Sequence, residues 1–321
     1  MTDPLFAAVD LGGTNVSAIV ADFQGRVLGE DIRPSQATAG FDATLAAMLH
    51  SLSAAIERAS VERGALHGLG VASPGAVDTS RGVVTGAPQL AGWKDVPLVE
   101  ILQERLGISV RIENDASAAA LGEHTFGAGR GTRHMIFLTI STGLGGGIII
   151  DGKLYTGSRG FAGEIGHAII DFNGKDCSFC GRGCLESLAS GAAIARRAVA
   201  AIADGGAPLL ARLVVDAPVT AELVADAARQ GDEACRRIYR ETGGYLGVTL
   251  ANCVNIFNPE AIILGGGVTL AADLFLEDTR KAMAEMAIRE PLKDVRLALG
   301  ELGDLAGCLG MIALMRDRPT P

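Results

Sequence analysis

The sequence predicts an α/β protein built from two similar α/β units. Apolar, β-rich runs alternate along the chain with stretches whose apolar residues recur at helical spacing, an order typical of α/β architectures. The layout of the opening segment, residues 5–30, returns with different residues from His134 onward. Three apolar runs lead directly into glycine-rich turns. The length of 321 residues also favours two domains over one.

The first unit is predicted element by element. Residues 5–30 alternate apolar runs with Gly-Gly and Gln-Gly, which predicts a strand, a glycine-rich turn, a second strand, a tight turn and a third strand. Helical spacing then predicts a helix over about Phe41–Arg63. A short strand ends in Ser-Pro-Gly at residues 73–75. Further on, a strand and a helix are expected on the two sides of a break at Asn114-Asp115.

The second unit repeats this order of parts. A buried strand that begins at His134 is expected to run into a polar, glycine-rich turn, Ser141–Gly147. A second apolar strand then leads to a tight turn at Asp151-Gly152. A later strand, Ala261–Leu264, runs into Gly265-Gly266-Gly267 and a helical stretch.

Composition and charge indicate a globular protein and disfavour nucleic acid and anionic membranes as partners. Hydrophobic residues make up 48% of the chain and charged residues 20%, which is ample for a globular core. The formal net charge of −9 disfavours nucleic acid and anionic membranes as partners. Neither a signal peptide nor a membrane span is recognisable, so a cytoplasmic location is expected. Thiols remain reduced there, and clustered cysteines indicate metal binding or catalysis.

The three glycine turns together predict a nucleotide phosphate site between two domains. Glycines allow backbone N–H groups to approach an anion, threonine hydroxyls add donors, and Asp10 could hold Mg²⁺ through water. Any one turn is explained equally well by a tight hairpin. Neither a P-loop motif nor a Rossmann glycine motif is present, so the phosphate clamp is of another kind. The candidate nucleotide-binding residues are Asp10, Gly12, Gly13, Thr14, Thr142, Gly143, Gly145, Gly265 and Gly266.

Three of the six cysteines lie within eight positions, downstream of a histidine. His167, Cys177, Cys180 and Cys184 offer one nitrogen and three sulfurs, a closed tetrahedral set for structural Zn²⁺. The alternative is a set of reduced core cysteines. Glycines and charged residues interleave with the cysteines, which makes a buried apolar segment the poorer explanation.

Six segments carry a resemblance to a known family. They are AVDLGGTN, GVASPGAVD, ENDASAAALGE, TGLGGGIIIDGKLYTG, GEIGH and CGRGCLE, and they lie in this order between residues 8 and 186. In this order they resemble the ROK family of sugar kinases and sugar-responsive repressors, and most of all its bacterial glucokinases. The resemblance implies the two-lobed, actin-like, ribonuclease H-like fold shared with hexokinases, with ATP and sugar in a cleft. The expected smaller lobe comprises residues 1–117 and 304–321, and the larger lobe residues 118–303.

The resemblance also implies roles for individual residues. Asp115 matches the family's general base, although an aspartate before an apolar helical run is also a common N-cap. The Ser-Pro-Gly turn would shape the sugar pocket, with simple turn chemistry as the alternative. The implied sugar-binding residues are Gly75, Asn114, Asp115, Glu164, His167 and Glu186.

The cysteine motif departs from the family's pattern by one position. The usual form is C-x-C-G-x-x-G-C-x-E, whereas this chain has C-x-x-C-G-x-G-C-x-E. The outer cysteines and the glutamate keep their spacing, and the middle cysteine is displaced to Cys180. This displacement puts Cys180 in doubt as a ligand, although Cys-x₂-Cys is itself a common zinc spacing.

The function implied is an ATP-dependent sugar kinase that phosphorylates the 6-hydroxyl of a hexose, with glucose as first candidate, in glycolysis. ATP, Mg²⁺ and structural Zn²⁺ are the implied cofactors, and a homodimer or higher homo-oligomer is expected. The alternatives are a kinase for N-acetylmannosamine, N-acetylglucosamine or fructose, a non-catalytic sugar sensor, and an actin-like or chaperone ATPase. The early first phosphate strand and the negative charge count against a DNA-binding sensor. The predicted sugar ligands count against the ATPase.

Overall fold

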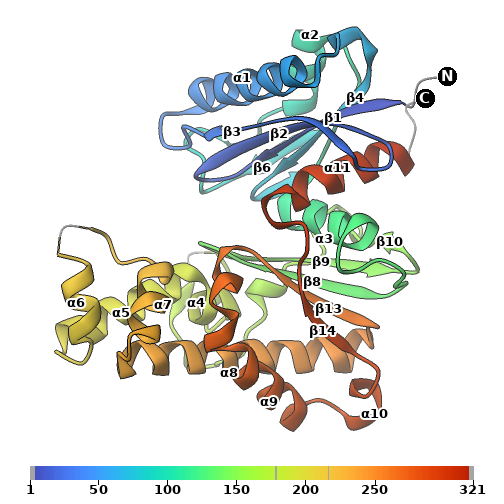
Figure 1. Ribbon diagram of the computed structural model, residues 1–321. Coiled ribbons are helices and arrows are strands. Elements are labelled where there is room, and N and C mark those ends of the chain that lie inside the picture. Colours follow the sequence, from blue (N-terminus) through green and yellow to red (C-terminus); the bar gives the residue numbers. More distant parts are fainter. Residues whose placement is uncertain (1–3, 178, 216, 318–321) are drawn as a thin grey trace. The chain divides into compact units, whose positions relative to one another are not determined.

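The computed structural model describes residues 4–177, 179–215 and 217–317 (Figure 1). The ends of the predicted smaller lobe, residues 1–3 and 318–321, lie outside the described residues. The chain forms two compact units. Unit 1 comprises Met1–Arg133, Gly147–Gly163 and Gly300–Pro321, and unit 2 comprises His134–Gly146 and Glu164–Leu299. The lobe boundaries expected from the sequence remain a prediction, and the one after Ser117 falls inside helix α3 (Asp115–Phe126).

Two five-stranded sheets share one strand order (Figure 1). The first has the order β3-β2-β1-β4-β7, and the second has the order β10-β9-β8-β13-β14. In each sheet a central strand has its two successors on one side and two later strands on the other. The predicted α/β class and the predicted duplication are therefore confirmed. The strands of the first sheet are β1 (Leu5–Leu11), β2 (Asn15–Asp22), β3 (Val27–Pro34), β4 (Leu66–Ser73) and β7 (Val110–Asn114). Those of the second are β8 (Met135–Ile140), β9 (Leu144–Ile150), β10 (Lys153–Leu154), β13 (Ala261–Gly265) and β14 (Arg296–Leu299).

Unit 1 buries both faces of its sheet. Alternate residues of β1 belong to two different core clusters, since Ala7 and Val9 lie in one and Phe6 and Ala8 in the other. Helices α1 and α2 contribute to the first cluster, and α3 and α11 contribute to the second. This explains the nearly continuous apolar run of β1. The other elements are α1 (Phe41–Ala59), η1 (Arg63–Ala65), β5 (Ala76–Asp78), β6 (Val83–Gly86), α2 (Leu98–Leu106), η4 (Gly303–Leu305) and α11 (Ala306–Asp317).

Helix α1 is shorter than the predicted Phe41–Arg63. It ends at Ala59 because Ser60 adopts a left-handed conformation, with φ 56° and ψ 41°. The N–H of Ser60 donates to the carbonyl oxygen of Glu57, which closes the helix in the manner of a left-handed C-cap.

Unit 2 is mostly helical outside its strands. Side chains cap three of its helices: Ser190, Thr220 and Asp232 each accept a backbone N–H three residues ahead. No helix in the described part of the chain is long and apolar enough to cross a membrane. The elements are η2 (Ile165–His167), β11 (Asp176–Cys177), β12 (Gly181–Arg182), α4 (Leu185–Ala189), α5 (Gly191–Ala203), α6 (Pro208–Leu213), α7 (Ala221–Arg229), α8 (Glu233–Phe257), η3 (Gly267–Leu274), α9 (Leu276–Met286) and α10 (Arg289–Leu292).

Candidate functional site

Asp10 lies near the end of β1, directly before the first glycine turn. The turn is closed by a hydrogen bond from the N–H of Gly12 to the carbonyl oxygen of Asn15, at 2.8 Å. Gly13 and Thr14 are exposed. The structure therefore places the predicted phosphate-binding residues of unit 1 in one accessible turn next to a carboxylate.

Two further carboxylates and helix α11 lie close to Asp10. Loss of hydration raises the pKa of Asp10 to about 8, and the negative charges of Asp115 and Asp304 add to this rise. A Cβ atom on Gly307, in the first turn of α11, would lie 2.1 Å from Oδ2 of Asp10, so only glycine leaves room for this carboxylate. A nearby cation would stabilise the ionised form of such a group, which makes the position suitable for Mg²⁺.

Asn114 and Asp115 stand at the junction of β7 and α3. The parallel pairing of β7 with β4 continues as far as Asn114, which lies opposite Ser73. Asn114 is the N-cap, since its Oδ1 accepts the N–H of Ser117 at 3.1 Å. The alternative interpretation of Asp115 as the N-cap is therefore wrong. Asp115 is the first helical residue, and its Oδ1 accepts the N–H of Ala116 at 2.8 Å.

The Ser-Pro-Gly turn lies against Asn114. Nδ2 of Asn114 donates to the carbonyl oxygen of Gly75 at 3.2 Å. Gly75 has φ 82°, and a Cβ atom there would lie 2.3 Å from the carbonyl oxygen of Gly86. Glycine is thus required at this turn, which brings the predicted sugar-binding Gly75, Asn114 and Asp115 together in unit 1.

The glycine-rich turn of the second sheet is shorter than the predicted Ser141–Gly147. Strand β9 begins at Leu144, so Gly145 lies in the strand and not in the turn. A Cβ atom on Gly147 would lie 2.3 Å from Cβ of Ala120 in α3. Glycine is therefore needed in this part of the strand because a helix packs closely against it.

The remaining predicted nucleotide-binding residues of unit 2, Thr142, Gly143, Gly265 and Gly266, lie at the ends of β8 and β13. These two strands pair in parallel. Gly266 has φ 85°, and a Cβ atom there would lie 2.4 Å from the carbonyl oxygen of Ile140, the last residue of β8. The turn after β8 and the turn after β13 therefore lie next to each other.

Glu186, in the first turn of α4, is bonded to the start of β9, directly after the turn that follows β8. Its Oε2 accepts the N–H of Leu144 at 2.9 Å. A Cβ atom on Gly143 would lie 2.8 Å from the same oxygen. The start of α5 binds this turn as well, since the N–H of Gly191 donates to the carbonyl oxygen of Ser141 at 2.8 Å. A predicted sugar ligand and a predicted phosphate-binding turn thus share a hydrogen bond.

Glu164 and His167 lie at the two ends of the short helix η2. Nε2 of His167 is 3.9 Å from Oε2 of Glu164. Loss of hydration raises the pKa of Glu164, His167 opposes this rise, and the negative charge of Glu186 adds to it. The three predicted sugar ligands of unit 2 therefore form one group of two carboxylates and an imidazole.

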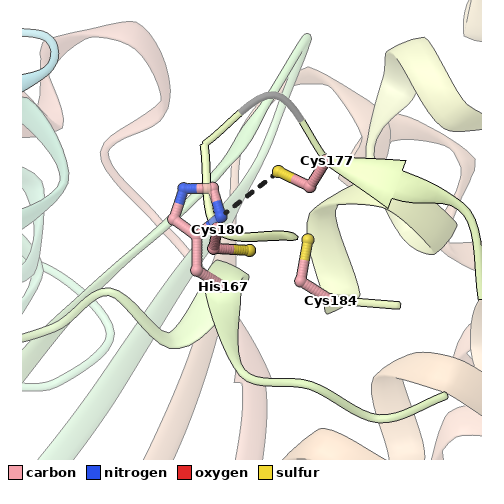
Figure 2. Close-up of side chains that lie close together, drawn as sticks. All are labelled: His167, Cys177, Cys180 and Cys184. Atoms are coloured by element: carbon pink, nitrogen blue, oxygen red, sulfur yellow. Dashed lines mark hydrogen bonds between the residues drawn. The ribbon is translucent and has the colours of Figure 1, made fainter. Parts of the chain in front are cut away.

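His167 also belongs to a cluster with Cys177, Cys180 and Cys184 (Figure 2). One ligand atom of each residue lies within 4.8 Å of those of the other three. Sγ of Cys177 is 3.8 Å from Nδ1 of His167, the ring nitrogen that faces the cysteines (Figure 2). Nε2 has Glu164 as its neighbour instead. The displaced cysteine of the motif, Cys180, is a member of the cluster.

The acid–base properties of Cys177 and Cys180 fit a metal site. Burial would raise the pKa of Cys177, but hydrogen bonds from the N–H groups of Phe179 and Cys180 and from the thiols of Cys184 and Cys180 outweigh it and lower this pKa. Loss of hydration and the neighbouring sulfurs raise the pKa of Cys180 to about 12. Three close sulfurs do not all ionise unless a cation joins them. Three thiolates and a neutral imidazole are a common tetrahedral set for Zn²⁺.

Sequence analysis does not identify three contacts of the candidate site. They are Gly307 with Asp10, the Leu144 amide with Glu186, and the Phe179 ring with His167. A glycine inside an apolar helix often indicates a close approach, so the first contact had a signal in the sequence. The other two depend on tertiary structure.

Comparison with known proteins gives these features a context. A sequence model of the ROK family matches residues 6–318. A glucokinase of Streptomyces coelicolor is 36% identical over 99% of this chain and 99% of its own length. A xylose repressor of Caldicellulosiruptor bescii is 32% identical over 96% of this chain and 77% of its own length.

A solved structure has the same fold. The crystal structure of a ROK family glucokinase from Streptomyces griseus, in complex with glucose and AMPPNP, superposes with a TM-score of 0.85 at 36% identity. The match covers 98% of this chain and 100% of the other. This likeness confirms the predicted actin-like fold.

Proposed function

The chain belongs to the ROK family, and from this premise we propose that it is an ATP-dependent hexose kinase. It transfers the γ-phosphoryl group to the 6-hydroxyl of the sugar, with glucose as the first candidate. The observation that carries the proposal is the junction of β7 and α3. Asn114 caps the helix there, so the carboxylate of Asp115 does not serve as the cap.

Asp115 is the proposed general base. Phosphoryl transfer requires alignment, neutralisation of charge, and a group that accepts the proton of the attacking hydroxyl. A base acts as such only when it is ionised, and the N-terminal turn of a helix favours an anion through its N–H groups. Asp115 occupies that turn of α3, and the neighbouring side chain of Asn114 is the proposed ligand of adjacent sugar hydroxyls.

The glycine turns are the proposed phosphate-binding elements. Backbone N–H groups of Gly13 and Thr14 in unit 1 suit an anionic phosphate chain, and so do those of the turns after β8 and β13. Gly12 shapes the first turn, because its N–H donates to Asn15. Asp10 is the proposed partner of Mg²⁺, through water. Burial and the negative charges of neighbouring carboxylates raise the pKa of Asp10, and a cation would stabilise its ionised form. The relative from Streptomyces griseus carries AMPPNP, which supports ATP as the donor.

Glu164, His167 and Glu186 are the proposed sugar ligands of unit 2. The Cys₃His cluster would hold Zn²⁺, which supplies a structural cross-link to the loop that carries these ligands. Nδ1 of His167 faces the sulfurs, so Nε2 is the nitrogen that remains for a sugar hydroxyl. The metal would thus be structural and still necessary for sugar binding.

A sugar sensor without catalytic activity is the second candidate, because a xylose repressor is among the relatives. Other acceptors, namely N-acetylmannosamine, N-acetylglucosamine and fructose, are further candidates, since shared ligands bind shared hydroxyls. A sensor would retain sugar binding and show no phosphoryl transfer.

A coupled assay with Mg·ATP across glucose, mannose, fructose, N-acetylglucosamine and N-acetylmannosamine tests the proposal. We expect turnover of one hexose, and loss of about 10²- to 10⁴-fold in kcat in Asp115→Asn, because the amide cannot accept the proton. Asp42→Asn is the matched control, since Asp42 is also a first-turn acidic residue of a helix in unit 1. Its kcat should stay within about twofold of wild type.

Two results would change the conclusion. Sugar binding by calorimetry without turnover of any sugar, in protein with its metal in place, would favour the sensor. Turnover that is equal in wild type and Asp115→Asn would establish a kinase and remove Asp115 from the role of base.

A further inference from the structure

Phe179 lies flat against the imidazole of His167. The two ring centroids are 5.2 Å apart and the ring planes differ by 8°. Phe179 is also joined to the cysteine cluster, because its N–H donates to Sγ of Cys177 at 3.4 Å. Its side chain is 55% exposed, although large apolar side chains are usually buried. The packing of a core therefore does not account for a phenylalanine at this position.

The cysteine motif of the resembled family differs from this chain at position 179. With the outer cysteines held in place, Phe179 occupies the position at which the family's motif has its middle cysteine. Displacement of that cysteine to Cys180 leaves position 179 available for an aromatic ring. The displaced thiol still joins the cluster, so the aromatic side chain is added without the loss of a sulfur.

The imidazole has two tasks that depend on its orientation. Nδ1 faces Cys177, and Nε2 lies 3.9 Å from Oε2 of Glu164. A single bond from a metal to Nδ1 would fix the position of that nitrogen, but the ring plane could still tilt about it. Partners beyond the direct ligands commonly restrict such motion in metal sites. A flat aromatic contact on one ring face restricts the tilt.

We propose that Phe179 is a positioning residue for sugar binding. By stacking on His167 it holds Nε2 toward Glu164 and the sugar hydroxyl while Nδ1 stays with the sulfurs. The inference rests on the proposed function, since it assigns the sugar to Nε2. It predicts that an aromatic ring at position 179 matters for sugar affinity and has no part in nucleotide binding.

Phe179→Leu, Phe179→Tyr and Phe172→Leu test the proposal in the full-length, zinc-loaded protein. Phe172 is the matched control because it is an exposed phenylalanine of the same loop, at 84% exposure. Calorimetry would measure the Kd of the accepted hexose and of AMPPNP, with zinc per chain measured on each sample. Phe179→Leu should weaken sugar binding about 3- to 10-fold, the range of an aromatic pair, with zinc content and AMPPNP affinity unchanged. Phe179→Tyr and Phe172→Leu should stay within about twofold.

A second readout needs no ligand. A stacked ring shifts the ring-proton resonances of its neighbour, so the His167 resonances should move between wild type and Phe179→Leu and stay in place in Phe172→Leu. Identical His167 resonances in wild type and Phe179→Leu would overturn the stack. Unchanged sugar affinity in zinc-loaded Phe179→Leu would overturn the positioning role, and so would loss of zinc from this variant. Wild-type protein that binds no hexose would contradict the proposed function, whereas the resonances would still decide whether the stack exists.

Discussion

The two units hold their candidate functional residues by different means. In unit 1, Asp10 lies on a strand paired on both sides, and Asp115 begins a helix of 12 residues. In unit 2, Glu164 precedes a 3₁₀ turn of three residues and His167 is its last residue. The cysteines lie on and around β11 and β12, which have two residues each. Regular secondary structure therefore positions the first group, and a cluster of side chains positions the second.

This difference indicates where a cross-link is needed. A sheet and a long helix order their residues through many backbone hydrogen bonds, whereas a loop with two very short strands has few bonds to offset its conformational entropy. A metal bound by four side chains can replace that missing order. The candidate residues of unit 1 should therefore be insensitive to zinc, and the sugar ligands Glu164 and His167 of unit 2 should depend on it.

Gly307→Ala should have the largest effect, and it tests unit 1. The new Cβ would lie 2.1 Å from Oδ2 of Asp10, so this carboxylate must move. Since misplacement by about 1 Å can cost 10²-fold, we expect kcat/KM for Mg·ATP to fall about 10- to 100-fold, with zinc content unchanged. Alanine favours helices over glycine, so loss of helix would not explain the result. Gly64→Ala is the control, because no atom lies within 4 Å of its Cβ position. If Gly307→Ala had the same steady-state kinetics as Gly64→Ala, close packing by Gly307 would not be what positions Asp10.

Gly143→Ala should have the next largest effect, and it tests unit 2. The added Cβ would displace Oε2 of Glu186 from the N–H of Leu144. Loss of a hydrogen bond to a charged group predicts sugar affinity about tenfold weaker, although Gly143 lies in a turn assigned to phosphate. Calorimetry with sugar alone measures this, with Gly244→Ala as the control in open space. If only nucleotide affinity changed, the hydrogen bond between Leu144 and Glu186 would have no role in sugar binding.

Asp31→Asn should have the smallest effect, and it tests the frame of unit 1 without touching the site. The main cause of the lowered pKa of Asp31 is a hydrogen bond from Arg33, and the positive charge of Arg58 contributes. Nε of Arg33 lies 2.7 Å from the carboxylate of Asp31, and Nη1 of Arg58 lies 2.8 Å from it. Because the folded pKa lies below the unfolded value of about 3.9, this stability is present above pH 4 and is lost as pH falls through the folded pKa. Urea unfolding should show a deficit of about 1 kcal/mol at pH 7 that vanishes in strong acid. A deficit independent of pH would exclude the ion pairs as its cause.

Local sequence predicted much of the fold, and the failures have physical causes. Apolar runs and glycines determine the strands, the turns and the repeated order of elements, and their effect is local, within a few residues. Asn114 and Asp115 are both good N-caps, and the choice between them depends on how far β7 pairs with β4. The glycines of Ser141–Gly147 predict a turn, but Gly147 lies in strand β9, where glycine permits close packing against Ala120.

The candidate site shows the same division. Its residue types and their spacing could be predicted, and the structure gathers the Cys₃His set as expected. The bond from Leu144 to Glu186 joins residues 42 positions apart, and no local signal indicates it. Contacts of this kind appear only when the chain is folded.

Metal removal followed by calorimetry tests the central claim most directly. Wild-type protein would be assayed for zinc, for turnover of the accepted hexose and for the Kd of sugar and AMPPNP, before chelation, after it, and after Zn²⁺ is restored. We predict one zinc ion per chain, and a loss of sugar affinity and turnover of at least about 10-fold that is reversed by Zn²⁺, with AMPPNP affinity retained. Demonstrably metal-free protein that binds and phosphorylates the sugar with unchanged constants would contradict the account.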